Sequence, residues 1–170
     1  MKKWILLLMV AFSMTVLGVS RTEGLGESIT SQIKFFMTRN DLEKSIQRKS
    51  VLEEGNIIYY ENVIDPIGVQ REVASFMFYD NYGIVSAVFS SYTTPQEHKK
   101  IVEAYKQYFK NVPESKLKKL ENSKSDTILY YNDKVLLQVK YFNGNETFIT
   151  VQIYSEENLQ YRINEIKNLK

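Results

Sequence analysis

Two stretches of alternating apolar and polar residues, 72–91 and 127–154, constrain the fold of this chain more than any other feature. Such alternation is typical of strands that bury one face. In the first stretch, strands over 72–79 and 84–91 flank the loop Asp80-Asn81-Tyr82-Gly83. If they pair across this loop, the apolar side chains share one face, namely Ala74, Phe76, Phe78, Val85, Ala87 and Phe89, while Ser75, Ser86 and Ser90 share the other. This agreement predicts a half-buried antiparallel sheet.

The second stretch predicts three strands, over 127–131, 134–142 and 146–154, with turns at Asn132-Asp133 and Asn143-Gly144-Asn145. The last two strands match again: Val135, Leu137, Val139 and Tyr141 come opposite Ile153, Val151, Ile149 and Thr147 on one face. A tight turn at Asn132-Asp133 would place Leu129 opposite Leu136 on the other face, where Gln138 and Thr150 also point.

Helices are expected before, between and after these strands. Thr94-Pro95-Gln96-Glu97 is a capping box with proline at the first helical position, and Pro113 ends the helix that follows. Ser155 precedes a last helix over 156–169. Residues 28–49 have helical spacing of apolar residues, with a break near Asn40, and a strand over 33–38 is the alternative. One short strand is expected over 57–61.

The predicted architecture is therefore α+β: a helix and a three-stranded antiparallel meander, twice, followed by a C-terminal helix. We expect one domain over 28–170, with pseudo-repeats over about 28–92 and 94–154. Two short similarities indicate the repeat: residues 57–60 match 128–131 at an offset of 71, and the apolar spacing of 29–37 matches that of 101–109 at an offset of 72.

In this order of elements the chain resembles small exported modules built from tandem helix-plus-meander units, such as the β-lactamase-inhibitor-like fold. The resemblance lies in topology alone and is carried by no diagnostic motif. It implies binding or inhibitory roles, although a shared fold does not define a function. Those inhibitor proteins use disulfides, whereas this chain has no cysteine.

The N-terminus predicts export. Lys2 and Lys3 precede an apolar run to Leu17, and Gly18-Val19-Ser20 has the small residues of a signal-peptidase site. We expect a signal peptide over 1–20, cleavage after Ser20 and a flexible lead over 21–27, which places the protein in the periplasm, the bacterial envelope or the extracellular medium. Retention of the segment as a membrane anchor is the alternative, since Arg21 follows the site directly.

Charge argues against nucleic acid as a partner. Lys2 and Lys3 are the only charges in residues 1–20, so the rest of the chain carries 20 Lys and Arg against 20 Asp and Glu. Binding to phosphates draws on an excess of clustered basic residues. We therefore expect no nucleic-acid partner, and membrane contact only through an uncleaved N-terminal segment.

The residue types needed for catalysis are sparse. His98 is the only histidine and is expected to be solvated in the first turn of a helix, and without cysteine no zinc or iron site is predicted. The adjacent pairs Glu53-Glu54 and Glu156-Glu157 leave a carboxylate-based hydrolase as a minor alternative. We expect no catalytic residue, cofactor or metal, and hence no enzyme.

The leading hypothesis is a non-enzymatic binding module, such as an inhibitor or an envelope assembly factor, that binds another protein through a sheet face. A membrane-tethered structural protein is the alternative. An outward Leu–Leu pair with nearby aromatic residues is the composition of an interface centre. The predicted partner-binding residues are Leu129, Tyr131, Leu136, Phe148 and Tyr154, with cover by another part of the chain as the alternative.

Overall fold

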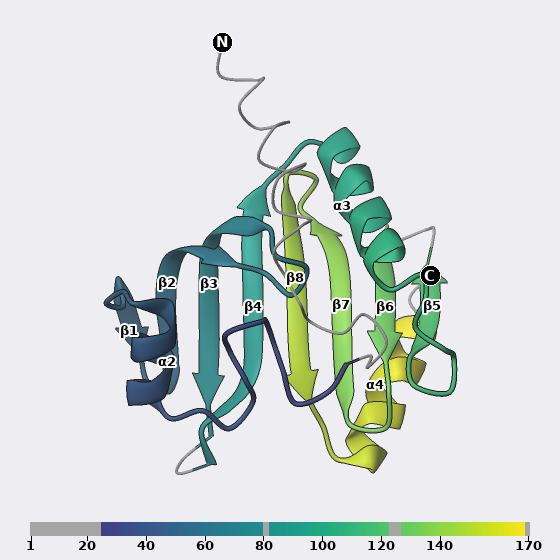
Figure 1. Cartoon of the computed structure of the whole chain (residues 1–170). Coiled ribbons are helices and arrows are strands. Elements are labelled where there is room, and N and C mark those ends of the chain that lie inside the picture. The colour runs from purple at the N-terminus through teal and green to yellow at the C-terminus, as the bar shows by residue number, and fades with distance from the viewer. Residues whose placement is uncertain (1–24, 80–81, 123–126, 169–170) are drawn as a thin grey trace.

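The computed structural model describes residues 25–79, 82–122 and 127–168, which form an α+β fold of three helices and eight strands. The strands make one antiparallel sheet in the order β1-β2-β3-β4-β8-β7-β6-β5 (Figure 1). In chain order the elements are α2 (Arg39–Ile46), β1 (Leu52–Glu54), β2 (Ile57–Ile64), β3 (Gln70–Phe78), β4 (Ile84–Tyr92), α3 (Pro95–Tyr108), β5 (Lys118–Asn122), β6 (Thr127–Tyr131), β7 (Val135–Phe142), β8 (Glu146–Ile153) and α4 (Glu156–Lys167). Two runs of four strands meet where β4 pairs with β8.

The expectation of three strands in each run is wrong by one strand on each side. β1 and β5 form the two edges of the sheet, and sequence alternation does not mark either of them. β1 has only three residues, all exposed, and β5 reads Lys-Lys-Leu-Glu-Asn. Short, charged strands are typical of sheet edges because they discourage pairing with other chains.

The first half of the predicted helix over 28–49 is also wrong. Residues 25–38 cross the sheet as an irregular segment, and α2 begins only after Thr38, whose hydroxyl accepts a hydrogen bond from Asp41 N. Phe36 N donates to Ile84 O and Ile84 N to Met37 O, so part of the segment pairs beside β4. The spacing of its apolar residues reflects burial over the sheet rather than a helix: Leu25, Ile29, Ile33 and Phe35 are all buried.

Of the predicted flexible lead over 21–27, the structure describes residues 25–27. Leu25 is buried, and Asn132 Nδ2 donates a hydrogen bond to its carbonyl oxygen. The segment is thereby attached to the β6–β7 hairpin. Residues 1–24, with the predicted signal peptide and cleavage site, lie outside the described residues.

Of the three predicted strand registers, one is confirmed in full and one in part. β7 and β8 pair as expected, from Val135 opposite Ile153 to Tyr141 opposite Thr147. β3 and β4 pair as expected with Ala74 opposite Phe89 and Phe76 opposite Ala87, but a bulge then places Phe78 opposite Ile84 rather than Val85, so the predicted register is wrong at this end. The registers also place Ile58 and Tyr60 of β2 on the same face as Ile128 and Tyr130 of β6, an offset of 70 rather than 71. An odd offset would have turned each side chain to the opposite face.

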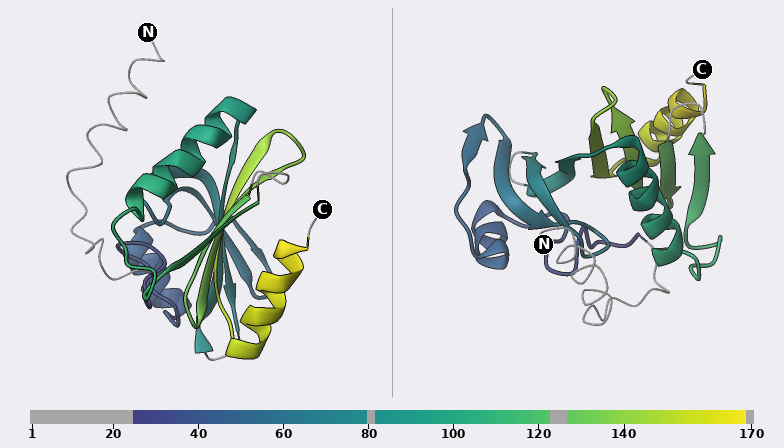
Figure 2. Two further views of the ribbon diagram at one scale, coloured as in Figure 1. Left: turned by 90° about the vertical axis from the view of Figure 1, so that its right-hand side faces the viewer. Right: turned by 90° about the horizontal axis from the view of Figure 1, so that it is seen from above.

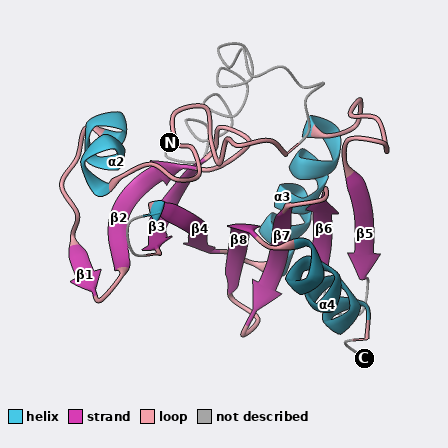
Figure 3. Ribbon diagram, turned by 90° about the horizontal axis from the view of Figure 1, so that it is seen from below, coloured by secondary structure: helices cyan, strands magenta, loops and turns pink. Residues whose placement is uncertain are grey.

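The core lies between the sheet and the layer made by α2, the 25–38 segment and α3 (Figure 2). The predicted capping box at Thr94 and Glu97 is confirmed, and α3 buries Tyr105 and Phe109 against the sheet. The Phe109 ring lies 4.6 Å from the Tyr130 ring between centroids. α4 packs on the opposite face of the sheet, over its β5–β7 end (Figures 2 and 3).

Candidate protein-binding surface

The two leucines at the centre of the predicted partner-binding face are not accessible. Leu129 is 0% and Leu136 1% exposed, because α4 lays Leu159, Ile163 and Ile166 over them. The cover alternative is therefore the correct one for this pair. The amphipathic C-terminal helix was predicted from the sequence, but the face of the sheet on which it packs was not.

The register expected between β6 and β7 is also wrong. Tyr131 pairs with Leu136 and Leu129 with Gln138, two residues away from the predicted pairing. Asn132 causes the shift: its side-chain oxygen accepts hydrogen bonds from Lys134 N and Val135 N, so the tight turn is Asp133-Lys134. Because a shift of two residues keeps the strand faces, Leu129 and Leu136 still point away from the main core.

The other three predicted residues lie at or beyond the margin of α4. Tyr131 and Tyr154 are half-buried and pack beside the leucines, and Tyr154 donates a hydrogen bond to Gln152. Phe148 lies on β8, and its ring contacts the Phe142 ring edge to face with 5.7 Å between the ring centroids. Of the five residues, Phe148 alone points to a part of the sheet that α4 leaves uncovered.

This uncovered part is the half of the same sheet face that spans β2, β3, β4 and β8, called here the open face. No described helix lies on that side of these four strands (Figure 3). The strand registers align its side chains in rows across the sheet. The residues of the open face are Ile57, Tyr59, Glu61, Val73, Ser75, Met77, Ser86, Val88, Ser90, Tyr92, Glu146, Phe148, Thr150 and Gln152.

The open face is nearly free of charge and partly apolar. Glu61 and Glu146 are its charged residues, while Val73 is 36% and Met77 38% exposed. Lys140 and Phe142 of β7 lie at its border, with the ammonium group 5.6 Å from the ring centroid. Ser86 was expected to face outward and does lie on this face, yet it is buried among its neighbours, as is Gln138 beside α4. The face combines short hydroxyl side chains with isolated aliphatic ones.

The expectation for His98 is wrong, because its side chain is buried. Its Nδ1 lies 3.0 Å from Thr147 Oγ1, which is 2.7 Å from Thr93 Oγ1. The imidazole also stacks on the Tyr141 ring at 4.9 Å between centroids. Thr147 is itself fully buried, so this group joins α3 to the β7–β8 hairpin and presents no accessible nucleophile.

A buried carboxylate also escaped the sequence analysis. Asp65, at the end of β2, accepts hydrogen bonds from Ile67 N, Val69 N, Arg71 Nε and Tyr105 Oη, and Arg71 Nη2 lies 2.7 Å from its Oδ2. Both charged side chains are nearly inaccessible. Every acceptor position of the carboxylate is used, so the cluster links the β2–β3 turn to α3 and binds no further ligand. Asp65-Pro66-Ile67-Gly68 was a recognisable turn signal that pointed to a structural role.

Among the described residues, no three His, Cys, Asp or Glu side chains come together as a possible metal site. In the same part of the chain, no helix is long and apolar enough to cross a membrane. The fold and surface thus define an open-sheet α+β protein with its main core on one sheet face and a helix over half of the other. No family model, curated protein or solved structure matches the chain.

Proposed function

We propose that the chain is an exported, non-enzymatic protein-binding module whose contact surface is the open face of β2, β3, β4 and β8. The observation that supports this most is the unequal cover of the two halves of one sheet face. α4 buries Leu129 and Leu136 on one half, while Val73 and Met77 stay exposed on the other. Aliphatic side chains exposed on a sheet face that the chain leaves uncovered support this face as a site for another protein.

The composition of the open face favours a protein over other partners. Its charged residues, Glu61 and Glu146, are both acidic, whereas nucleic acid and anionic lipid require clustered basic residues. The side chains of Ser75, Ser90 and Thr150 are short and project little from the sheet. Phe148 and Phe142 form an aromatic border. Aliphatic and aromatic groups with a polar surround match the centre of a protein interface.

Export rests on the N-terminal segment. The charged start, apolar run and small residues of 1–20 favour a cleaved signal, and the absence of cysteine suits a fold that needs no disulfide outside the cytoplasm. The order of a helix and four strands, twice, together with the matching places of Ile58-Tyr60 and Ile128-Tyr130, supports two related halves of an exported binding module.

Capture of a partner tests the proposal. The whole chain is used as bait on the envelope fraction of the producing cell, beside Met77→Lys on the open face and Tyr161→Lys on the exposed side of α4. A lysine at either exposed site keeps its charge in solvent, so both variants should fold. The proposal expects one protein that the wild type and Tyr161→Lys retain at equal stoichiometry and Met77→Lys loses. Equal capture by all three variants, or no capture by any, would contradict it.

A further inference from the structure

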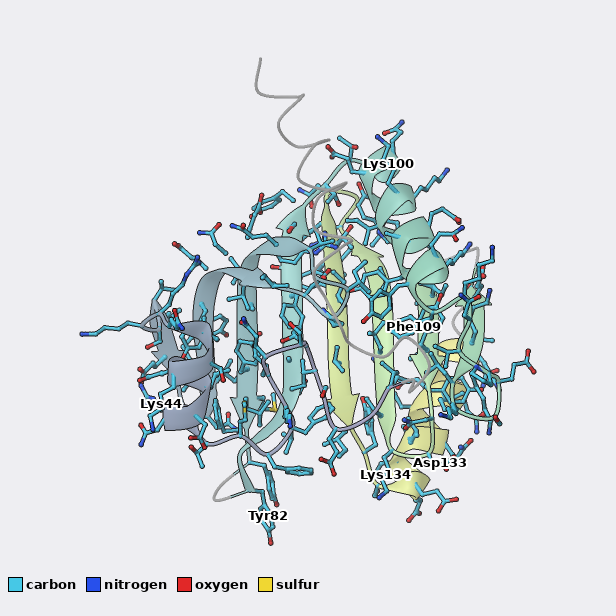
Figure 4. All side chains as sticks on the ribbon, in the orientation of Figure 1. Lys44, Tyr82, Lys100, Phe109, Asp133 and Lys134 are labelled. Atoms are coloured by element: carbon cyan, nitrogen blue, oxygen red, sulfur yellow. The ribbon has the colours of Figure 1, made fainter. Side chains whose placement is uncertain are left out.

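A concave surface lies at the end of the sheet, on the core side. It is a cleft of about 510 Å³ between the N-terminal segment, the loop after α3 and the β6–β7 hairpin. This volume is within the range of ligand-binding sites. Figure 4 places Asp133 and Lys134 of the hairpin at the same end of the molecule as Tyr82, opposite Lys100.

The floor of the cleft is apolar. It is lined by the side chains of Leu25, Leu117 and Val135, which are mostly buried, and by Ile153 of β8. Phe36 forms one lip and is 51% exposed. The cleft can therefore hold an apolar group and cover it with an aromatic ring.

The rim carries charges of both signs. Glu27, Glu114 and Asp133 line the cleft together with Lys116, Lys118 and Lys134. Within the described residues none of these six side chains belongs to an ion pair, whereas Lys119 and Lys106 nearby both bind Glu121. The rim is neutral as a whole, which disfavours a phosphate, a nucleic acid or an anionic membrane as the occupant.

The lip residue is held in an unfavourable backbone conformation. Phe36 has φ = 65°, a region that non-glycine residues rarely adopt. Its N–H donates to Ile84 O, which fixes the conformation beside the β3–β4 hairpin. On that hairpin Tyr79 and Tyr82 are exposed, with ring centroids 5.9 Å apart. Tyrosine is enriched among the residues that dominate binding energy in protein interfaces.

We propose that this cleft binds an extended segment of a partner polypeptide, with one apolar side chain on the floor under Phe36 and charged side chains of both signs against the rim. A polypeptide is the occupant that supplies apolar groups together with acidic and basic ones. The cleft and the open face lie on opposite faces of the sheet, so the inference stands without the proposed function.

The test uses a displayed library of random twelve-residue peptides, selected on the whole chain and then measured by calorimetry. The variants are Phe36→Asn, which tolerates a positive φ, Phe36→Tyr, which keeps the ring, and Phe142→Asn on the border of the open face as the matched control. Selected peptides should combine an apolar residue with both acidic and basic residues. They should bind Phe36→Asn at least tenfold more weakly than wild type, and should bind Phe36→Tyr and Phe142→Asn within threefold of it.

Three results would overturn the proposal: no peptide that binds, peptides that Phe36→Asn binds as well as wild type does, or peptides of a single charge sign. Loss of binding in Phe142→Asn alone would assign the peptides to the open face. Light scattering could also show a dimer of the wild type and a monomer of Phe36→Asn. A second copy of the chain would then be the occupant of the cleft, and this result would also contradict the proposal. If Phe36→Asn does not fold, Lys134→Glu replaces it. Peptides selected on Lys134→Glu should contain more basic residues than peptides selected on wild type, and an unchanged charge preference would overturn the proposal.

Discussion

At Gly83 the β3–β4 hairpin meets the N-terminal segment more closely than any side chain allows. A Cβ atom there would lie 2.5 Å from Phe36 O, and φ is 85°. Gly83 therefore serves both the hairpin turn and the position of the Phe36 lip.

A comparison of Gly83, Gly144 and Gly26 separates the cost of a positive φ from the cost of the close approach to Phe36. Gly144 has φ = 73° with open space around it, and Gly26 has neither a positive φ nor a close neighbour. We expect Gly83→Ala to lower the free energy of unfolding by about 2–4 kcal/mol, Gly144→Ala by about 1 kcal/mol, and Gly26→Ala by less than about 0.5 kcal/mol. Urea unfolding followed by circular dichroism measures all three. Equal effects at Gly83 and Gly144 would show that the close approach to Phe36 is absent.

Buried tyrosines should respond to loss of the hydroxyl group according to whether that group has a hydrogen-bond partner. Tyr105 donates a 3.0 Å hydrogen bond to Asp65, while the hydroxyls of Tyr60 and Tyr130 have no partner among the described residues. A buried polar group without a partner destabilises the fold, whereas loss of a hydrogen bond to a buried carboxylate costs about 1.5–3 kcal/mol. Tyr60→Phe should therefore leave stability unchanged or raise it by about 1 kcal/mol, and Tyr105→Phe should lower it by about 2 kcal/mol. The same sign and size for both variants in denaturant titrations would contradict these assignments.

Residue by residue, the sequence predicted what depends on local pattern. The capping box at Thr94 and the alternating face of β8 follow from neighbours in sequence, and both are confirmed. The burial of His98 could not be predicted, since its partner Thr147 lies 49 residues away. Asn132 displaced the turn because its side chain, rather than its backbone, accepts the closing hydrogen bonds.

Among the elements, α4 changed the candidate site most. Its amphipathic pattern predicts burial of Leu159, Ile163 and Ile166, but that pattern alone does not select a face of the sheet. The apolar spacing of the 25–38 segment was equally ambiguous: buried residues at helical intervals also suit an irregular segment that lies flat on a sheet. The edge strands β1 and β5 carry no alternating pattern because neither buries a full face.

The packing of α4 predicts a large effect at Leu136. Leu136→Ala should lower the free energy of unfolding by about 2–5 kcal/mol, because it opens a cavity beneath the helix. Leu52→Ala on the exposed edge strand, the matched control, should change it by less than about 0.5 kcal/mol. Thermal unfolding of the two variants checks this. A small effect at Leu136 would mean that α4 does not cover the sheet in solution.

At the scale of the whole molecule, burial of tyrosines should limit stability at alkaline pH. Burial raises the pKa of Tyr60 to about 12, with the nearby Glu43 carboxylate contributing, and burial followed by Asp65 raises the pKa of Tyr105 well above its usual range. Unfolded tyrosine titrates near 10. Above that pH the unfolded chain loses protons that the folded chain retains, so the free energy of unfolding falls as pH rises.

The urea midpoint should therefore vary little with tyrosine ionisation below pH 10 and should fall between about pH 10 and 12. Tyr60→Phe should reduce the slope of that fall relative to wild type. A slope that Tyr60→Phe leaves unchanged would show that Tyr60 does not titrate as its burial requires.

Photo-cross-linking within the producing cell tests the central claim, that the open face carries the partner, most directly. A photoreactive phenylalanine analogue is placed at Met77, on the open face, and separately at Tyr161, on the exposed side of α4. Both positions are on the surface, so both proteins should fold and be produced in equal amounts. We expect one discrete cross-linked protein at Met77 and none at Tyr161. A cross-link at Tyr161 with none at Met77 would contradict it.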